Sequence, residues 1–450
     1  MTTGANPGAQ AATSPWPEPL IALVRSLPEY RRLWVAFSGG LDSTVLLHLA
    51  VAARATAELP TAIHVNHQLQ PNADAMAQHC QDVAATLGVP VQVHRVSVVA
   101  SDTPAGGLEE AARNARYRVF EEVLGPGDLL LMAHHADDQA ETLVFRLLRG
   151  TGVRGLAGMP RQRQLGQGML YRPLLSVSRD VLAQAARAAG VTWKDDPSNA
   201  DPRFDRNFLR HQALPVLRSR WPDLNRRLAA TAEACREAAV LADALAERQW
   251  RECTEDGQTL AVAGLGRLPV AEQKNLMQWW IRRGGWPVPA IRGWPEVLGQ
   301  LLAAAPDRAP ELVGEGFRVR RYQGRLHLVA EQPSARPVEA TLCPGQPLRW
   351  GDWQLILQPA GDQPAPSIQV RARLGGERFR PQPGGPLKTL KNWLQETAVP
   401  PWERARLPLV FEASEGAESL VAVGDFWCSE QYSGSAPAAG WRLVVERDCD

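Results

Sequence analysis

Short apolar runs alternate with helical periodicity over the first half of the chain. Apolar runs of strand length predict β-strands over residues 33–37, 61–65, 91–98 and 128–133. Apolar positions spaced three and four apart predict helices over residues 43–54, 73–87, 108–123 and 139–148. Strands that alternate with helices indicate an α/β domain with a doubly wound parallel sheet covered on both faces. Such sheets bind ligands at the carboxyl ends of their strands, so chemistry is expected just after each strand.

The second half of the chain differs in pattern and composition. Helices are predicted over residues 207–220 and 223–251, with a break at Trp221-Pro222, and 12 of the 15 tryptophans lie beyond residue 216. Proline-rich segments at residues 305–310 and 332–337 indicate boundaries. We therefore predict a loose tail, an N-terminal domain, a linker helix with a small middle domain, and a C-terminal domain, over residues 1–19, 20–220, 221–335 and 340–450. The two later domains are expected to be small and mixed α/β.

Composition excludes several classes of protein. The 450 residues are 45% hydrophobic and 22% charged, which is typical of a soluble chain with a sizeable core. No apolar run approaches the ~18 residues of a membrane span, and the N-terminus lacks the pattern of a secretory signal. The six cysteines form no CxxC pair, which argues against a disulfide framework or a zinc ribbon. We expect a cytoplasmic protein with no membrane partner.

The net charge of +1 conceals two basic stretches. Residues 143–180 hold seven arginines against one acid, and residues 371–406 hold eight basic residues against three acids. Local basic patches on a neutral chain favour a polyanionic partner such as nucleic acid. Solvated surface arginines are the alternative.

A glycine-rich turn follows the first predicted strand and precedes a helix. Its sequence is Ser38-Gly39-Gly40-Leu41-Asp42-Ser43. Glycines let the backbone approach an anion, and the helix start offers unpaired N–H groups and hydroxyls. No lysine follows the glycines, so the turn does not match the Walker pattern. The turn predicts a phosphate cradle, against the alternative of an ordinary capped turn.

This turn resembles the PP-loop of the ATP-pyrophosphatase superfamily, whose members cleave ATP to AMP and pyrophosphate. Further motifs narrow the resemblance to the tRNA(Ile)-lysidine synthase family. They are His64–Leu69 (HVNHQL), Glu110–Arg113 with Arg116-Tyr117, Ala133–Thr142 (AHHADDQAET), Arg149–Gly152, Arg172–Leu175, Asp196–Asn199, Arg206-Asn207, Gly375–Arg380, and Leu387-Lys388 through Pro401–Arg404. The resemblance covers nearly the whole chain after the tail and is weak around residues 250–340.

The resemblance implies a two-step reaction on the isoleucine tRNA with a CAU anticodon. ATP, with Mg²⁺, adenylates the C2 carbonyl oxygen of the wobble cytidine, and the ε-amine of free lysine then displaces AMP to leave lysidine. The C2 carbonyl oxygen is a poor leaving group, and its conversion into an adenylate lets it depart easily. The lysine amine, with a pKa of ~10.4 in water, must lose a proton before it attacks. The sequence leaves open whether the chain forms a homodimer.

Acids and histidines gather after the fourth predicted strand. Asp138 and Glu141 are three residues apart on one helical face, where they can bind an ammonium group and accept its proton. The same spacing also fits a capping box. A zinc site at His134 and His135 is disfavoured because adjacent strand residues point to opposite faces. Mg²⁺ bridging ATP phosphates, with Asp42 as a ligand, is favoured instead.

The predicted catalytic residues are Asp42, Arg113, His134, Asp138 and Glu141. The interpretation of Arg113 as a phosphate or carbonyl contact competes with a helical pair to Glu109 or Glu110. His64 and His67 are left without a role. Gly150–Gly155 matches GxGxxG but follows a helix, so we interpret it as a basic loop facing tRNA, or as a plain helix C-cap at Gly150.

Cations outside the ATP site are the predicted tRNA contacts. These are Arg149, Arg154, Arg206, Arg378, Arg380, Lys388 and Lys391. Phe379, Trp393 and Trp402 either stack on bases or fill the core, with Trp402 favoured as core. A PP-loop tRNA thiolase, a glutamine-dependent amidotransferase and a non-catalytic tRNA-binding protein are the competing functions. The cysteine pattern argues against the first two, and the complete acidic cluster argues against the third.

Overall fold

The structure, a computed structural model, describes residues 14–54, 58–69, 72–97, 107–194, 205–304, 310–331, 339–382, 384–414, 417–434 and 437–447. The chain divides into two compact units, Met1–Ala242 and Asp243–Asp450. Most of the predicted tail, the Asp196–Asn199 motif and most of the two proline-rich segments lie outside the described residues. No helix in the part that the structure describes is long and apolar enough to cross a membrane.

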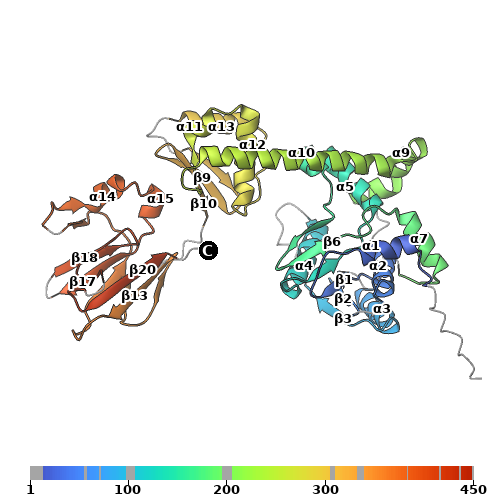
Figure 1. The fold of residues 1–450 in the computed structure, drawn as a ribbon, viewed down its shortest axis with the longest axis horizontal. Helices are drawn as coiled ribbons and strands as arrows, with labels where there is room; N and C mark the ends of the chain where they lie inside the picture. Colours follow the sequence, from blue (N-terminus) through green and yellow to red (C-terminus); the bar gives the residue numbers. More distant parts are fainter. Residues whose placement is uncertain are drawn as a thin grey trace, which may run out of the picture. The chain divides into compact units, whose positions relative to one another are not determined.

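The first unit is built on a six-stranded sheet in the order β3-β2-β1-β4-β6-β5 (Figure 1). Its strands are β1 (Leu33–Ala36), β2 (Thr61–Asn66), β3 (Val91–Arg95), β4 (Leu129–Leu131), β5 (Gln162–Leu165) and β6 (Gly168–Tyr171). All neighbours pair in parallel except β5, which forms an antiparallel edge hairpin with β6. The predicted parallel α/β sheet is confirmed. The β5–β6 hairpin was not predicted, because its first strand is polar and mostly exposed.

Side chains that alternate along the strands pack into two separate cores, one on each face of the sheet. Leu33 and Val35 pack beneath one group of helices, whereas Trp34 packs beneath another. The first group comprises α1 (Glu18–Arg25), α2 (Leu41–Ala52), α3 (Ala73–Thr86) and α7 (Arg179–Ala188). The second core is built around α4 (Gly107–Val123). The sheet is therefore covered on both faces, and its order changes direction at β1 and β4, which is where such sheets bind ligands.

Three helical segments lead out of this sheet. The helix α5 (Ala136–Leu148) follows β4 and begins three residues before the predicted start at 139. The predicted helix 207–220 is split into α8 (Asp205–Phe208), a π-helical turn (Leu209–Ala213) and α9 (Leu214–Arg220). It ends at Arg220, before the Trp221-Pro222 break, as predicted, and α10 (Leu224–Cys253) begins shortly after.

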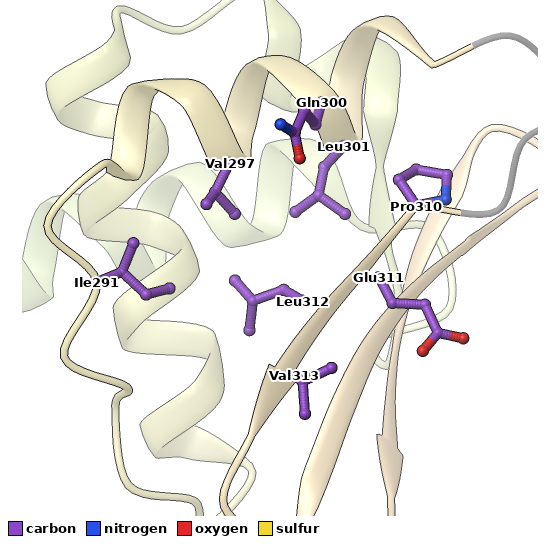
Figure 2. A pocket seen from close by; sticks show the side chains of 8 residues that line it. All are labelled: Ile291, Val297, Gln300, Leu301, Pro310, Glu311, Leu312 and Val313. Atoms are coloured by element: carbon purple, nitrogen blue, oxygen red, sulfur yellow. The ribbon is translucent and has the colours of Figure 1, made fainter.

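The second unit begins within α10 and contains two antiparallel regions. Residues 260–330 form the sheet β7-β10-β9-β8, from β7 (Leu260–Ala261), β8 (Glu311–Gly314), β9 (Phe317–Tyr322) and β10 (Arg325–Ala330). It packs with α11 (Val262–Gly266), α12 (Val270–Arg283) and α13 (Trp294–Ala303) around a core that holds Trp250, Trp280 and Trp294. A cavity of about 230 Å³ lies between α13 and β8, and Figure 2 shows the side chains that line it. The Glu311 carboxylate pairs with Arg318 and Arg320.

The C-terminal region is mostly antiparallel sheet. Its strands are β11 (Glu339–Thr341), β12 (Leu348–Trp350), β13 (Trp353–Pro359), β14 (Ser367–Arg371), β15 (Arg378–Phe379), β16 (Lys388–Thr389), β17 (Leu409–Ser414), β18 (Ala417–Val423), β19 (Trp427–Cys428) and β20 (Trp441–Arg447). They are joined by α14 (Leu390–Glu396) and α15 (Pro401–Arg404). Trp350, Trp353 and Tyr432 are fully buried, so much of the tryptophan enrichment serves the core of this unit.

Candidate active site

The glycine-rich turn joins β1 to α2 and is held by its own hydroxyl groups. The Ser38 backbone N–H donates to Ser43 Oγ at 3.2 Å, and the two serine hydroxyls lie 3.0 Å apart. Ser43 Oγ and Thr44 Oγ1 both donate to the Gly40 carbonyl, at 3.1 and 2.9 Å. No side chain caps the start of α2 at Gly40. The first N–H groups of the helix, from Leu41, Asp42 and Ser43, are therefore available to an anion.

Gly39 is required by conformation and by space. Its φ is +82°, and a Cβ there would lie 2.9 Å from Met76 Sδ and 3.0 Å from Cys80 Sγ. The backbone N–H of Lys194 donates to the Gly39 carbonyl at 3.2 Å, which ties the turn to a segment 155 residues away in sequence. The sequence motifs did not identify Lys194, which has no neighbouring pattern that marks it.

Asp42 lies in the first turn of α2 and has one carboxylate oxygen without a hydrogen bond. Its side chain is 30% exposed, and its Oδ2 lies 3.6 Å from His135 Nε2. Its Oδ1 is buried and makes no hydrogen bond, with Arg179 Nε at 3.9 Å. Among the described residues no cluster of three acidic, histidine or cysteine side chains could hold a metal ion. Mg²⁺ is commonly held by one or two carboxylates together with phosphates and water, so the orphaned Oδ1 fits this ion without such a cluster.

His135 caps α5 and lies between carboxylates. Its Nδ1 accepts from the Asp138 N–H at 3.3 Å, while Asp138 Oδ2 accepts from the His135 N–H at 3.0 Å. Burial works against a charged imidazole, but the Asp42 hydrogen bond and the charges of Asp138, Asp42 and Asp137 outweigh it and raise the pKa of His135. The cap hydrogen bond needs an unprotonated Nδ1 and therefore opposes this rise. The capping box thus pairs His135 with Asp138, and the alternative box from Asp138 to Glu141 is wrong.

Glu141 and Asp138 share one arginine that the sequence motifs did not identify. Arg210, in the π-helical turn, donates from Nε and Nη2 to the two Glu141 oxygens at 2.7 and 2.9 Å, and from Nη2 to Asp138 Oδ1 at 3.0 Å. The Glu141 side chain is only 4% exposed. Burial raises its pKa although Arg210 opposes the rise. The shared helical face of the two acids was predicted, but their common cation was not.

Asp137, also in α5, forms a second set of contacts with neighbouring helices. Its Oδ2 accepts from the backbone N–H of Arg179 at 2.8 Å, and its Oδ1 lies 2.5 Å from Arg218 Nη2. Burial would raise the pKa of Asp137, but the Arg179 N–H and Arg218 outweigh it and lower the pKa. This carboxylate therefore joins α5 to the start of α7 and to α9.

His134 lies beside guanidinium groups rather than carboxylates. Its Nδ1 accepts from Arg172 Nε at 3.1 Å. Burial and the charges of Arg172 and Arg113 hold the pKa of His134 well below its usual range. Arg113 is exposed, and its guanidinium lies over the Tyr117 ring at 5.0 Å. The charge of Arg113, in α4, therefore acts on His134, and the catalytic roles of both residues stay predictions.

His64 and His67 belong to the structure behind the turn. His64 is buried, with Nδ1 at 2.9 Å from the Phe37 carbonyl and 3.3 Å from Cys80 Sγ. Burial and the charge of Arg116 lower the pKa of His67 to about 4. Both therefore act as neutral side chains at physiological pH.

The N-terminal tRNA candidates differ in their surroundings. Gly150 follows the C-cap residue Arg149 of α5 and has a φ of +74°, as a glycine that ends a helix does, and the tRNA-facing role of the GxGxxG segment stays a prediction. The segment continues as α6 (Val153–Leu156), held by Arg146 through the Gly155 and Gly158 carbonyls. Arg149 is exposed beside Phe145, Arg154 donates to the Ala239 carbonyl at 3.5 Å, and Arg206 is half-buried.

Five of the eight cations in the C-terminal basic stretch have local partners. Ion pairs or hydrogen bonds engage Arg371, Arg373, Lys388, Arg404 and Arg406. Arg378, Arg380 and Lys391, here called the C-terminal cation group, are exposed and form no ion pair with any described acid. Phe379 and Trp393 are buried in the core, whereas Trp402 is half-buried against Tyr322 and His327. The prediction that favoured Trp402 as the core residue is therefore wrong.

Comparisons with known proteins match three parts of the chain. Family models described as a PP-loop domain, a TilS substrate binding domain and a TilS substrate C-terminal domain match residues 18–217, 260–327 and 368–445. A tRNA(Ile)-lysidine synthase of Alkalilimnicola ehrlichii is 40% identical over 92% of this chain and 93% of its own. That of Pseudomonas aeruginosa is 41% identical over 94% and 95%. A solved U34-tRNA thiolase from Methanococcus maripaludis covers 48% of this chain and 78% of its own, at 16% identity and a TM-score of 0.41.

Proposed function

The chain belongs to the tRNA(Ile)-lysidine synthase family, and from this premise we propose how its residues carry out the reaction. The protein is a ligase that forms lysidine on tRNA(Ile), and it uses ATP at its PP-loop domain. The relatives favour this function over tRNA thiolation. Free lysine, Mg²⁺, a cytoplasmic location and the residue roles below are our proposal.

One observation carries the proposal. The uncapped start of α2 lies next to the His135 and Asp138 cap of α5, through the 3.6 Å approach of Asp42 to His135. This approach supports an anion cradle beside a set of acids and histidines at the carboxyl ends of β1 and β4. An enzyme that adenylates a nucleobase with ATP and then binds an amine needs a phosphate-binding turn and a set of acids side by side.

In the first step the C2 carbonyl oxygen of the wobble cytidine attacks the α-phosphorus of ATP, and pyrophosphate leaves. The N–H groups of Leu41, Asp42 and Ser43, with the hydroxyl groups of Ser38 and Ser43, bind phosphate oxygens at the Gly39-Gly40 turn. Arg113 stabilises negative charge that develops on the phosphoryl oxygens. Asp42 would hold Mg²⁺, which neutralises phosphate charge when it is bound.

In the second step the ε-amine of lysine attacks C2, and AMP leaves with the former carbonyl oxygen. Asp138 and Glu141 bind the ammonium form of lysine, and one of them takes the proton that the amine must lose. Burial raises the pKa of the Glu141 carboxyl group although Arg210 opposes the rise, which supports Glu141 as an acceptor. Arg210 holds both carboxylates in place.

Binding of tRNA is assigned to two sets of cations. Arg149, Arg154, Arg206 and Lys388 remain candidates, and the C-terminal cation group is the stronger set because its charges are exposed. In this scheme residues 20–220 form the catalytic domain, residues 221–335 the linker helix and middle domain, and residues 340–450 the tRNA-binding domain. Cations that bind phosphate make affinity fall as salt rises.

Release of AMP from ATP tests the proposal. We expect the purified chain to release AMP and pyrophosphate when tRNA(Ile) with a CAU anticodon and lysine are both present. Omission of lysine should stop turnover after the adenylated intermediate. Turnover that needs a sulfur donor instead of lysine would contradict the assignment and favour thiolation.

A further inference from the structure

Arg172 is a buried arginine held by fixed partners. It follows β6 and is only 2% exposed. Its backbone N–H donates to the Arg161 carbonyl at 2.8 Å, and its Nη1 donates to the Pro160 carbonyl at 2.7 Å. These contacts leave its Nε aimed at His134 Nδ1 at 3.1 Å. A guanidinium held in this way cannot readily turn its Nε–H toward another acceptor.

This hydrogen bond determines which nitrogen of His134 carries the proton. A guanidinium donates hydrogen bonds and accepts none, so Nδ1 of His134 must be the unprotonated, accepting nitrogen. A neutral imidazole carries its proton on the other nitrogen, here Nε2. Nε2 makes no hydrogen bond with any residue that the structure describes. The N–H at this position is therefore left for a ligand.

We propose that Arg172 is a positioning residue that holds His134 as the neutral Nε2–H tautomer, so that His134 donates a hydrogen bond to an oxygen of the reacting nucleotide. His134 then takes no proton at Nδ1 during the reaction. The identity of that oxygen rests on the proposed function. The tautomer itself rests only on the contacts of Arg172.

The charges around His134 favour the same state. Arg172, Arg113 and Arg116 all disfavour an imidazolium at this position. A second proton would also break the Arg172 hydrogen bond and set two cations against each other. The neighbouring His135 faces Asp42, Asp137 and Asp138 and experiences the opposite field. Two adjacent histidines are thus assigned different chemical roles by the strands and helices that surround them.

A neutral N–H donor suits the reaction. Negative charge grows on phosphoryl oxygens during the first step and on the departing AMP during the second. A donor that is already fixed in place stabilises such charge without rearranging at the moment of reaction. Arg113 adds a positive charge nearby, so the pair combines a charged and a neutral donor.

Nuclear magnetic resonance tests the tautomer directly. In the full-length protein with ¹⁵N-labelled histidine, long-range ¹H–¹⁵N correlations report which ring nitrogens carry protons. The His134 signals are identified by their loss in His134→Gln. We expect a neutral ring protonated at Nε2 between pH 6 and pH 8, without substrates. A ring protonated at Nδ1, or at both nitrogens, would overturn the proposal. Because no turnover is needed, this outcome is independent of the proposed reaction.

Kinetics tests the positioning role. Gln carries an amide near the place of Nε2, and Asn near that of Nδ1. We expect His134→Gln to keep roughly tenfold more kcat than His134→Asn. Arg172→Gln should lower kcat by roughly 10–100-fold, with KM for ATP and lysine nearly unchanged. Arg172→Lys should rescue little, because it lacks the planar Nε donor.

A double-mutant cycle separates this role from a loss of packing. Arg172→Gln should add little to the defect of His134→Asn if Arg172 acts through His134. Fully additive losses, or equal kcat for His134→Gln and His134→Asn, would overturn the proposal. Thermal unfolding of each variant identifies those that fail to fold. If a variant fails to fold, the tautomer of His134 measured in the wild-type protein tests the proposal instead.

Discussion

Replacement of Gly39 by alanine should damage the PP-loop through the backbone itself. The residue has a φ of +82°, where an L-residue costs ~1–2 kcal/mol relative to glycine. Its new Cβ would lie 2.9 Å from Met76 Sδ and 3.0 Å from Cys80 Sγ, and such overpacking costs ~1–3 kcal/mol. The two effects act together, so we expect Gly39→Ala to destabilise the first unit by about 3 kcal/mol.

Gly40→Ala is the matched control one residue away. Gly40 has an extended backbone, with φ −80° and ψ 168°, and the nearest atoms to a Cβ lie at 3.7 and 3.9 Å. Alanine is a poorer N-cap than glycine but restricts the unfolded chain, so the net change should stay within about 0.5 kcal/mol. The closest atom is Ser38 Oγ, inside the cradle. We therefore expect Gly40→Ala to weaken ATP binding without loss of stability.

Hydrogen exchange of the α2 amides measures this difference within the first unit, which avoids treating a chain of two units as two-state. A loss of about 3 kcal/mol corresponds to roughly 100-fold less protection in Gly39→Ala. Gly40→Ala should match the wild-type protein. Equal protection in both variants would refute the argument from φ and space, and unchanged ATP affinity in Gly40→Ala would refute the cradle.

Three further predictions address the reaction and the tRNA. Asp42→Asn should keep the fold, as judged by circular dichroism, and abolish AMP release, because phosphate and Mg²⁺ geometry is lost; near-normal turnover would contradict this. Glu141→Gln should raise KM for lysine or lower kcat far more than it weakens ATP binding, and an equal loss of ATP affinity would argue for a structural role; Asp138→Asn is less clean because Asp138 also caps α5. Changing all three members of the C-terminal cation group to Gln should make the negative slope of log affinity against log salt shallower by roughly 2. Lys388→Gln removes a cation that is already paired with Glu396 and should change the slope less. Equal slopes in the triple variant and the wild-type protein would mean that the group is a solvated face.

Local pattern was enough to predict the central sheet and its ligand edge. The runs at β1 and β4 are apolar on both faces, as buried parallel strands require, and the glycine turn follows β1 directly. The β5–β6 hairpin escaped prediction because β5 is polar and lies at the sheet edge. The start of α5 was predicted three residues too late because its N-cap is His135, a residue type that is uncommon at this position.

The candidate site was predictable only where its residues lie close together in sequence. The spacing of Asp138 and Glu141 predicted their shared helical face, but their partner Arg210 is 69 residues from Glu141, in a π-helical turn of the predicted helix 207–220 where no motif marked it. Arg172 meets His134 across 38 residues, through the pairing of β4 with β6. The protonation of adjacent histidines depends on these long-range contacts, so spacing alone could not reveal it.

Incorporation of lysine into tRNA tests the central claim most directly. The protein is incubated with ATP, Mg²⁺, tRNA(Ile) bearing a CAU anticodon and lysine labelled with ¹⁵N at the ε-amine, and the tRNA is digested to nucleosides for mass spectrometry. The account predicts a modified cytidine that carries the ε-¹⁵N label at the wobble position, with one AMP released for each nucleoside formed. AMP release without labelled nucleoside, or a wobble base that carries sulfur instead of lysine, would contradict it.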